Sequence, residues 1–466
     1  MFEFDIAVIG GGPGGYAAAI RGVQRGARVC LIEREKLGGT CLQHGCIPTK
    51  AYHSTAQLLR RLLSAEEHGI KINDWSFDFA GAVHRKDVLV RRMTDGLKQL
   101  LKGYDVTIFQ GQAKLEGPGR IAIHRKAVTG HIRARNIILA TGSLAARPPS
   151  LAVDGKNILT SEEILAIQEL PESLMIVGGG YIGCEFAAIF AAFGCRTVLV
   201  EQQSALLGGS DADAVREITR SLKAQGVEVF TGTGIEGLEA RGGLVMTRLT
   251  DGRVMETSKA LVAVGRVPNS DNLGLEENGV RLDAGAIVVD EGMRTSLTGH
   301  YAIGDVTGGL QLAHVASHQA TVAVENALGG EARTDFRVLP SAVFTLPEMA
   351  QVGLTEAACQ TKEIDFKTGY FPYRTNGKAL CEGESQGFVK LLADRRDGTL
   401  LGGTIVGEEA SVLIAEVAAA MHQRLNIADL ATLIHAHPTL AEMIGESAAD
   451  ADGTAIHRAP AGDKRQ

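Results

Sequence analysis

Two cysteines that lie close together have the clearest chemistry in this sequence. Cys41 and Cys46 are separated by four residues, a spacing too short to staple a long loop. Pro48 follows, and proline suits the first turn of a helix. The apolar pattern then predicts a helix that begins at Lys50, with Ala51, Leu58, Leu59, Leu62 and Leu63. We therefore expect the pair at a helix N-terminus, where the helix dipole favours a thiolate and lowers the cysteine pKa.

Redox chemistry is a better interpretation of this pair than metal binding. A zinc site needs four ligands, and no second close pair of cysteines completes one, so no metal is predicted. In a cytosolic protein, paired cysteines are more often catalytic or metal-binding than structural. The remaining cysteines are scattered and are expected to be reduced thiols buried in cores: Cys30, Cys184, Cys195, Cys359 and Cys381.

His437 and Glu442 form a second reactive combination near the end of the chain. They lie five positions apart across Pro438, so the carboxylate can reach back and orient the imidazole. A single histidine near a chain end is more often structural. The carboxylate partner, and the need of two thiols for a base, favour a catalytic pair.

Two glycine-rich loops follow short apolar runs. Gly10, Gly12 and Gly15 fit G-x-G-x-x-G after Ile6–Ile9, and a second strand-like run ends in Glu33. Glycine allows a tight turn and close approach of the backbone to a pyrophosphate, while the acid accepts from a ribose hydroxyl. The same unit returns, with equal spacing, as Gly178, Gly180, Gly183 and Glu201. Two units predict two dinucleotide cofactors, or one cofactor and a degenerate copy.

The residues after Glu201 indicate which nucleotide the second unit takes. A carboxylate at this position suits the free 2′-hydroxyl of NAD, whereas NADP requires nearby arginines. No basic residue occurs between Glu201 and Arg216. The sequence therefore predicts NAD.

Length and composition indicate a multi-domain globular enzyme. The 466 residues suffice for about three domains. A net charge of −7 does not indicate the excess of basic residues that nucleic-acid binding needs. No apolar run reaches the roughly 18 residues of a membrane helix, and the N-terminus carries no cleavage signal. We therefore expect a cytoplasmic protein that binds neither nucleic acid nor membrane.

The order of elements predicts an α/β fold with an insertion. A long amphipathic helix (77–104) and strand-like pieces up to Ser143 precede a linker at Arg147–Pro149. After the second unit, a strand ending in Gly304-Asp305 and a helix (312–328) return to the first domain. The prediction is two Rossmann-like dinucleotide-binding domains, one (149–269) inserted in the other (1–148 and 270–336).

The last predicted domain, 337–466, has a different pattern. Strands at 387–392 and 400–406 surround a helix at 411–424, which is typical of an α+β domain on an antiparallel sheet. Residues 447–466 are small and polar, and we expect a frayed tail.

Together these motifs resemble the flavin disulfide reductases, most closely the dihydrolipoamide dehydrogenases, over residues 1 to about 450. The motifs are Gly10–Gly15, Cys41–Lys50, Gly178–Glu185, Gly265–Asn269, Gly304-Asp305 and His437–Glu442. The resemblance implies FAD in the first unit, NAD in the inserted unit and a homodimer interface in the last domain. It also implies oxidation of dihydrolipoyl groups, with electrons passing through the thiol pair and FAD to NAD. The partner would be the lipoyl domain of a 2-oxo acid dehydrogenase or glycine cleavage complex.

The resemblance also implies roles for individual residues. Cys46 would lie beside the flavin, and Cys41 would exchange with substrate. His437, held by Glu442, would be the base for the disulfide of the other subunit. Lys50 would pair with Glu185 near the flavin, Asp305 would bind the ribityl chain, and Gln311, Leu312, Ala313 and His314 would line the pyrimidine edge. Further cofactor-binding residues are expected at Ala113, Thr141, Gly142, Ser143, Ile235 and Gly265.

One departure and several alternatives accompany this resemblance. Gln43-His44 stands where the family usually has Asn and a small or apolar residue. Mercuric reductases and large thioredoxin reductases carry a second thiol pair near the C-terminus, but no cysteine follows Cys381. Glutathione reductases use NADP, against which Glu201 argues. Another disulfide reductase of the family remains an alternative, as does a non-catalytic metal-binding flavoprotein, which His437 and Glu442 disfavour.

Overall fold

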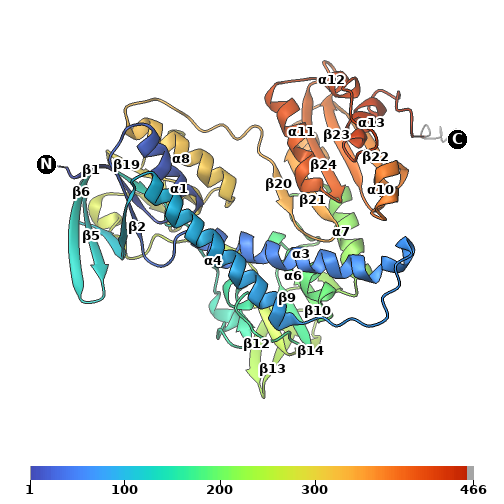
Figure 1. The fold of residues 1–466 in the computed structure, drawn as a ribbon, viewed down its shortest axis with the longest axis horizontal. Helices are drawn as coiled ribbons and strands as arrows, with labels where there is room; N and C mark the ends of the chain where they lie inside the picture. The colour runs from blue at the N-terminus through green and yellow to red at the C-terminus, as the bar shows by residue number, and fades with distance from the viewer. Residues whose placement is uncertain (1, 459–466) are drawn as a thin grey trace.

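The computed structural model describes residues 2–458 and contains three domains (Figure 1). The predicted fold class is confirmed: two doubly wound α/β units are followed by an antiparallel α+β domain. Met1 and residues 459–466 lie outside the described part. Among residues 2–458, no helix combines the length and the apolar character that a membrane span needs.

The first sheet carries the first glycine-rich loop. Its parallel strands have the order β3-β2-β1-β6-β19, and the N-terminal half of β6 also pairs antiparallel with a meander of β5 and β4. Helices α1 and α8 lie side by side on it (Figure 1). The bounds are β1 Phe4–Ile9, β2 Val29–Glu33, β3 Thr107–Gln110, β4 Gln112–Leu115, β5 Arg120–Arg125, β6 Val128–Leu139, β19 His300–Ala302, α1 Pro13–Gln24 and α8 Ala313–Ala327. The central strands are buried, which is why they read as continuous apolar runs.

The second sheet repeats this design in the inserted segment. Five parallel strands have the order β11-β10-β9-β15-β8, and an antiparallel meander of β12, β13 and β14 is attached. The bounds are β8 Ile158–Leu159, β9 Ser173–Val177, β10 Arg196–Glu201, β11 Glu228–Thr231, β12 Ile235–Arg241, β13 Leu244–Leu249, β14 Val254–Thr257, β15 Lys259–Val262, α6 Tyr181–Ala192 and α7 Ala212–Ala224.

Glycine is required at matching positions of the two units. Gly10 and Gly178 have φ angles of 104° and 106°, which favour glycine strongly. A Cβ atom on either would overlap with a carbonyl oxygen of the neighbouring strand's end, and one on Gly15 or Gly183 would overlap with the carbonyl oxygen of Gly10 or Gly178. The helix and the strand can approach this closely only without side chains.

The chain enters and leaves the inserted domain at one place. Strand β7 (Ser143–Ala145) leads out of the first domain, and β16 (Arg266–Pro268) returns and pairs with it. The Thr141 hydroxyl donates to the Asn269 carbonyl oxygen (2.7 Å). This double crossing is consistent with an insertion of about residues 149–269.

The C-terminal domain is built on an antiparallel sheet of order β20-β21-β24-β23-β22. Its predicted helix and strands are confirmed within two residues at each end. The bounds are β20 Ser341–Val343, β21 Glu348–Gly353, β22 Phe366–Pro372, β23 Phe388–Asp394, β24 Leu400–Gly407, α9 Glu356–Thr361, α10 Gly377–Cys381, α11 Ala410–His422, α12 Ile427–Ala431 and α13 Glu442–Asp450.

Two long helices run through the middle of the molecule (Figure 1). The predicted amphipathic helix is α4, Phe79–Gly103. The helix after the cysteines, α3, spans Cys46–Leu63, so its predicted start at Lys50 was wrong by four residues. Pro48 is accommodated in the first turn, where its missing N–H leaves no bond unmade. Leu59 is buried, but Leu58 and Leu63 are exposed in this chain.

Two other expectations were also wrong. The chain does not fray at Ser447, because α13 continues to Asp450 and Ser447 is fully buried. Gly369 of β22 has no side chain, so the Ser447 carbonyl group can approach it closely, and the Ser447 hydroxyl donates to the Val389 carbonyl oxygen (3.3 Å). Residues 459–466 of the expected tail lie outside the described residues. Cys381, expected in a core, is exposed at the end of a short helix, α10.

A buried ion cluster joins the C-terminal domain to the inserted domain. Lys390 on β23 is 2% exposed, and its Nζ lies 2.7 Å from Asp211 Oδ2 and 2.6 Å from Asp213 Oδ2. Asp211 is itself 1% exposed and caps the N-terminus of α7. The lysine therefore neutralises carboxylates that the fold has taken out of water.

We expect Lys390→Met to destabilise the protein strongly, by about 3–5 kcal/mol, because it leaves a buried carboxylate without its cation. The measurement is the midpoint of thermal unfolding. Arg337→Met is the matched control, since its ion pair with Asp335 is exposed and 2.7 Å long, and it should leave the midpoint nearly unchanged. Equal midpoints for the two variants would contradict the assignment.

Candidate active site

A single large cavity collects most of the predicted site residues. It has a volume of about 1230 Å³, and its walls come from the first glycine-rich loop, the end of β2, the cysteine segment and the loop before α8. Small-molecule pockets usually measure about 300–1,000 Å³, so this cavity has room for a dinucleotide. The predicted residues that line it are Gly10, Gly12, Glu33, Cys41, Cys46, Lys50, Ala113, Thr141, Gly142, Ser143, Glu185, Asp305, Gln311, Leu312, Ala313 and His314.

Glu33 closes one end of the cavity. Its Oε2 accepts from the Gly11 N–H (2.7 Å) and its Oε1 from the Glu35 N–H (2.6 Å). Glu201 repeats this arrangement at the second loop, accepting from the Gly179 N–H (2.6 Å) and the Gln203 N–H (2.7 Å). Each acid is thus held beside its glycine loop before any ribose arrives.

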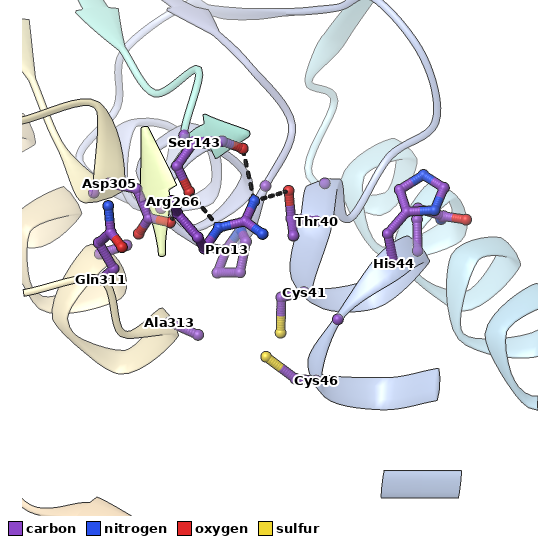
Figure 2. A pocket seen from close by; sticks show the side chains of 18 of the residues that line it. Pro13, Thr40, Cys41, His44, Cys46, Ser143, Arg266, Asp305, Gln311 and Ala313 are labelled. Carbon is purple, nitrogen blue, oxygen red and sulfur yellow. Dashed lines mark hydrogen bonds between the residues drawn. The ribbon is translucent and has the colours of Figure 1, made fainter. Parts of the chain in front are cut away.

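The two cysteines meet inside the cavity at the junction of two helices. Cys41 belongs to the short helix α2 (Gly39–His44), and Cys46 is the first residue of α3. Both are free thiols, and their sulfur atoms point toward one another (Figure 2). Gly45 between the two helices provides the sharp turn, with φ −145° and ψ −111°.

The pair is electrostatically asymmetric. The hydrogen bond from Cys41 is the largest influence on the pKa of Cys46, and together with the charge of Lys50 it outweighs burial and lowers that pKa. The pKa of Cys41 is raised by the same bond, then by burial and by the charge on Cys46. Of the two thiols, Cys46 is therefore the one that ionises more readily, and Cys41 is the hydrogen-bond donor.

An ion pair lies one turn further along α3. Lys50 Nζ is 2.8 Å from Glu185 Oε2 of α6, and Glu185 Oε1 also accepts from the Phe344 N–H (3.0 Å). The lysine lies 4.2 Å from the centre of the Phe344 ring. The expected partnership of Lys50 and Glu185 thus connects α3, the inserted domain and the strand that enters the C-terminal domain.

Arg266 is a cavity residue that the sequence analysis did not single out. Its Nε donates to the Ser143 hydroxyl (2.7 Å) and its Nη2 to the Ser143 carbonyl oxygen (2.8 Å), while Ser143 donates to Asp305 (Figure 2). The guanidinium lies within 3.5 Å of the Thr40 hydroxyl. Its place directly after Gly265, inside one of the recognised motifs, was the signal that could have found it.

Other predicted residues do not line this cavity. Gly15 packs below the first loop. His437 and Glu442 of the C-terminal domain are also absent from the lining. The remainder belong to the inserted domain: Gly178, Gly180, Gly183, Glu201, Ile235 and Gly265. Ile235 lies in β12 and packs against the core of that domain.

His437 and Glu442 are paired, with the histidine exposed and the carboxylate partly buried. His437 Nδ1 lies 2.9 Å from Glu442 Oε1, and the histidine side chain is 80% exposed. Burial raises the pKa of Glu442, but hydrogen bonds from the Thr439 N–H and from His437 outweigh it, so the net shift is downward. The neighbouring Ile434 is 95% exposed. The dyad therefore presents its imidazole at the surface of this chain, outside the cavity that holds the two thiols.

Comparison with known proteins assigns the family. The model of the pyridine nucleotide-disulphide oxidoreductase family matches residues 4–320, and that of its dimerisation domain matches residues 339–448. The chain belongs to this family. It is 39% identical over 461 residues to the dihydrolipoyl dehydrogenase of Chlamydia muridarum, with 98% of both chains covered. It is 37% identical to that of Bacillus subtilis, over 98% of this chain and 99% of the relative.

A solved structure supports the same assignment. LpdA from Mycobacterium tuberculosis has a TM-score of 0.90 and 31% sequence identity, over 95% of this chain and 98% of that one. The family is dependent on FAD and NAD, and the observed geometry fits both dinucleotides. The cavity gives the space and the glycine cradle for FAD, and the second loop with Glu201 gives the corresponding cradle for NAD.

The two residues that depart from the family pattern, Gln43 and His44, lie in different environments. Gln43 Nε2 donates to the Leu37 carbonyl oxygen (2.7 Å) and to the Thr94 hydroxyl (2.8 Å), and so ties α2 to α4. His44 is exposed, and its ring points away from both sulfur atoms (Figure 2). The longer glutamine amide therefore serves packing between helices, and His44 leaves the thiol pair undisturbed.

The hydrogen bond from Cys41 should be measurable as the pH at which Cys46 becomes reactive. Cys41→Ala removes the donor, so we expect its alkylation profile to lie about 1–2 pH units above that of Cys41→Ser, which keeps an O–H donor. Alkylation rates of the reduced, flavin-loaded enzyme are recorded against pH. Cys381 is an exposed thiol that would also react, so Cys381→Ser is used to measure its contribution to the alkylation rate. Coinciding profiles would show that the hydrogen bond does not set the pKa of Cys46.

Proposed function

We propose that this chain oxidises dihydrolipoyl groups to lipoyl groups and passes the electrons to NAD. The observation that carries the proposal is the asymmetric pair of Cys41 and Cys46 in a dinucleotide-sized cavity, in a chain that also presents a histidine–carboxylate dyad. The relatives named dihydrolipoyl dehydrogenase match over nearly the full chain. These matches favour a dihydrolipoyl substrate over glutathione or a metal ion.

The cysteines have distinct roles in this proposal. A substrate thiolate attacks the Cys41 sulfur of the oxidised pair, and Cys46 leaves as the thiolate that its surroundings favour. The second substrate thiol then attacks the mixed disulfide, which closes the lipoyl ring and returns Cys41 as a thiol. One disulfide is broken and one is formed, so the two electrons move from substrate to enzyme.

His437 serves as the base for the substrate thiols. The bond between Nδ1 and Glu442 leaves Nε2 to accept a proton from the substrate. Since the exposed dyad is not in its own chain's cavity lining, we assign it to the thiol pair of a second copy. The matching dimerisation domain supports a homodimer.

Residues of the cavity hold and orient FAD, which when bound supplies the two-electron acceptor beside Cys46. Glu33 and the first glycine loop are placed for the adenosine end and the pyrophosphate. Asp305, Ser143 and Arg266 border the middle of the cavity, and Lys50 with Glu185 borders its thiol end. The fixed ion pair places a positive charge beside Cys46 at no cost in rearrangement.

The physiological partner and place follow from the substrate. A lipoyl domain of a 2-oxo acid dehydrogenase or glycine cleavage complex would carry the dihydrolipoyl group to the thiol pair. The five cysteines outside the reactive pair are free thiols, which suits a reducing compartment, so we place the protein in the cytoplasm.

The direct test is an assay of dihydrolipoamide and glutathione couples with NAD and NADP. We expect turnover with dihydrolipoamide and NAD. A preference for glutathione would assign another disulfide reductase of the family. In an anaerobic titration, the enzyme should take up two electrons beyond those of its flavin. Uptake by the flavin alone would support the non-catalytic alternative.

Glu201 should set the preference for NAD. We expect Glu201→Arg to weaken NAD and improve NADP by at least tenfold each in kcat/KM, because the carboxylate repels a 2′-phosphate and the arginine attracts it. Glu33→Arg is the matched variant in the other loop and should instead impair FAD retention. A wild-type enzyme that already prefers NADP would overturn the assignment of Glu201.

Mixing two inactive variants tests the shared site. A heterodimer of Cys46→Ser and His437→Ala has one site with both lesions and one with neither, so it should regain about half of normal turnover. Loss of a general base costs about 10² to 10⁴ in rate, so restored activity would exceed the background. If His437 served its own chain, every site would keep one lesion. No recovery after confirmed subunit exchange would then exclude a base donated by the partner.

A further inference from the structure

A second histidine–carboxylate pair includes His435, which lies two residues before His437 in the chain. His435 Nε2 is 2.8 Å from Glu416 Oε1 on α11, and the His435 side chain is only 10% exposed. Neither the thiol chemistry nor the proton transfer proposed above uses this pair. Its place in the chain, two residues before His437, calls for an explanation.

The segment between α12 and α13 has little else to hold it. Of residues 432–438, which the structure describes completely, His435 is the one that is not exposed. The next buried residue is Leu440. A loop of exposed residues has few contacts that restrict its motion. Its C-terminal end is held by Leu440 and by Asn376, which donates to the Thr439 carbonyl oxygen (3.1 Å), so the His435 ring is the side-chain anchor of the part that precedes His437.

The ring also contacts the helix that carries Glu442. A Cβ atom placed on Gly445 of α13 would lie 3.2 Å from His435 Cε1, so the imidazole packs against the backbone there. On its other side it bonds to Glu416, one position after Ala415, which lines the cavity. His435 thus relates three parts to one another: α11 at the cavity wall, the loop with His437, and α13 with Glu442.

We propose that His435, through Glu416, is a positioning residue that fixes the loop presenting His437 to the thiol pair of a second copy of this chain. This inference rests on the proposed role of His437. The dyad of His437 and Glu442 sets the orientation of the imidazole within the loop, while His435 sets the position of the loop itself. An error of about 1 Å in placing a catalytic group can cost about 10² in rate.

The test uses flavin-loaded dimers and two reactions. Reduction by dihydrolipoamide in a single turnover needs the base, whereas NADH-dependent reduction of ferricyanide does not. His435→Leu should slow the first reaction about 10- to 100-fold and leave the second unchanged. His435→Gln retains an N–H donor for Glu416 and should keep most of the rate. His457→Leu is the matched control, since His457 pairs with Glu446 at 2.8 Å in an exposed position, and it should alter neither reaction.

Subunit mixing distinguishes positioning of the base from damage to the cavity. His435→Leu mixed with Cys46→Ser should regain about half of normal turnover, because one site then has intact thiols and an intact base. His435→Leu mixed with His437→Ala should regain nothing, because every site then depends on an impaired base. Recovery with His437→Ala, or a His435→Leu enzyme as active as wild type, would overturn the proposal.

The two proposals can fail separately. If His437→Ala alone retains full dihydrolipoamide activity, the role of His437 is wrong. If His437→Ala is inactive while His435→Leu is normal, only the positioning role fails. If His435→Leu does not fold, Glu416→Ala removes the other partner of the same hydrogen bond. Its rates are then measured in the same two reactions.

Discussion

The interaction between the Cys41 and Cys46 thiols, which shifts their pKa values in opposite directions, is the one on which the remainder of the site depends. A thiol that donates to its neighbour stabilises one sulfur as a thiolate and disfavours ionisation of the other. This asymmetry requires the two side chains to meet, and the turn at Gly45 between α2 and α3 brings them together. Lys50, one turn along α3, adds a positive charge on the same side. The position of α3 therefore decides the chemistry.

Several parts of the fold hold α3 in that position. Tyr52 of α3 is fully buried and packs edge-on against Phe193 near the end of α6, with ring centres 5.8 Å apart. Glu185 on α6 holds Lys50. Gln43 fixes α2 to α4. The first dinucleotide unit supplies the cavity, but the inserted unit supplies the counterion, so the thiol pair needs both domains.

The sequence predicted those features that depend on local backbone chemistry. The two glycine loops were recognisable because matching close approaches exclude side chains at Gly10, Gly15, Gly178 and Gly183. Of the features that depend on packing between distant segments, the pair of Lys50 and Glu185 was expected only through the family resemblance, and others were not predicted. Ser447 has the polar, small character of a tail residue, yet it is buried, because Gly369 of β22 has no side chain and lets the backbone of α13 pack closely against that strand. Likewise, from its sequence context Lys390 would be expected to be a surface lysine in a strand. Nothing in the neighbouring sequence indicates that its ammonium group contacts Asp211.

Under the proposed function, the location of His437 explains why one chain would not complete this site. A base that belonged to its own chain's thiols would be expected in the wall of the cavity, where burial would tune its pKa. Instead His437 is 80% exposed, whereas His435, which pairs with Glu416, is only 10% exposed. An exposed reactive group on a buried anchor is the arrangement needed when the substrate site lies on another molecule. The anchor keeps the geometry before docking, so that association covers the base without having to order its loop.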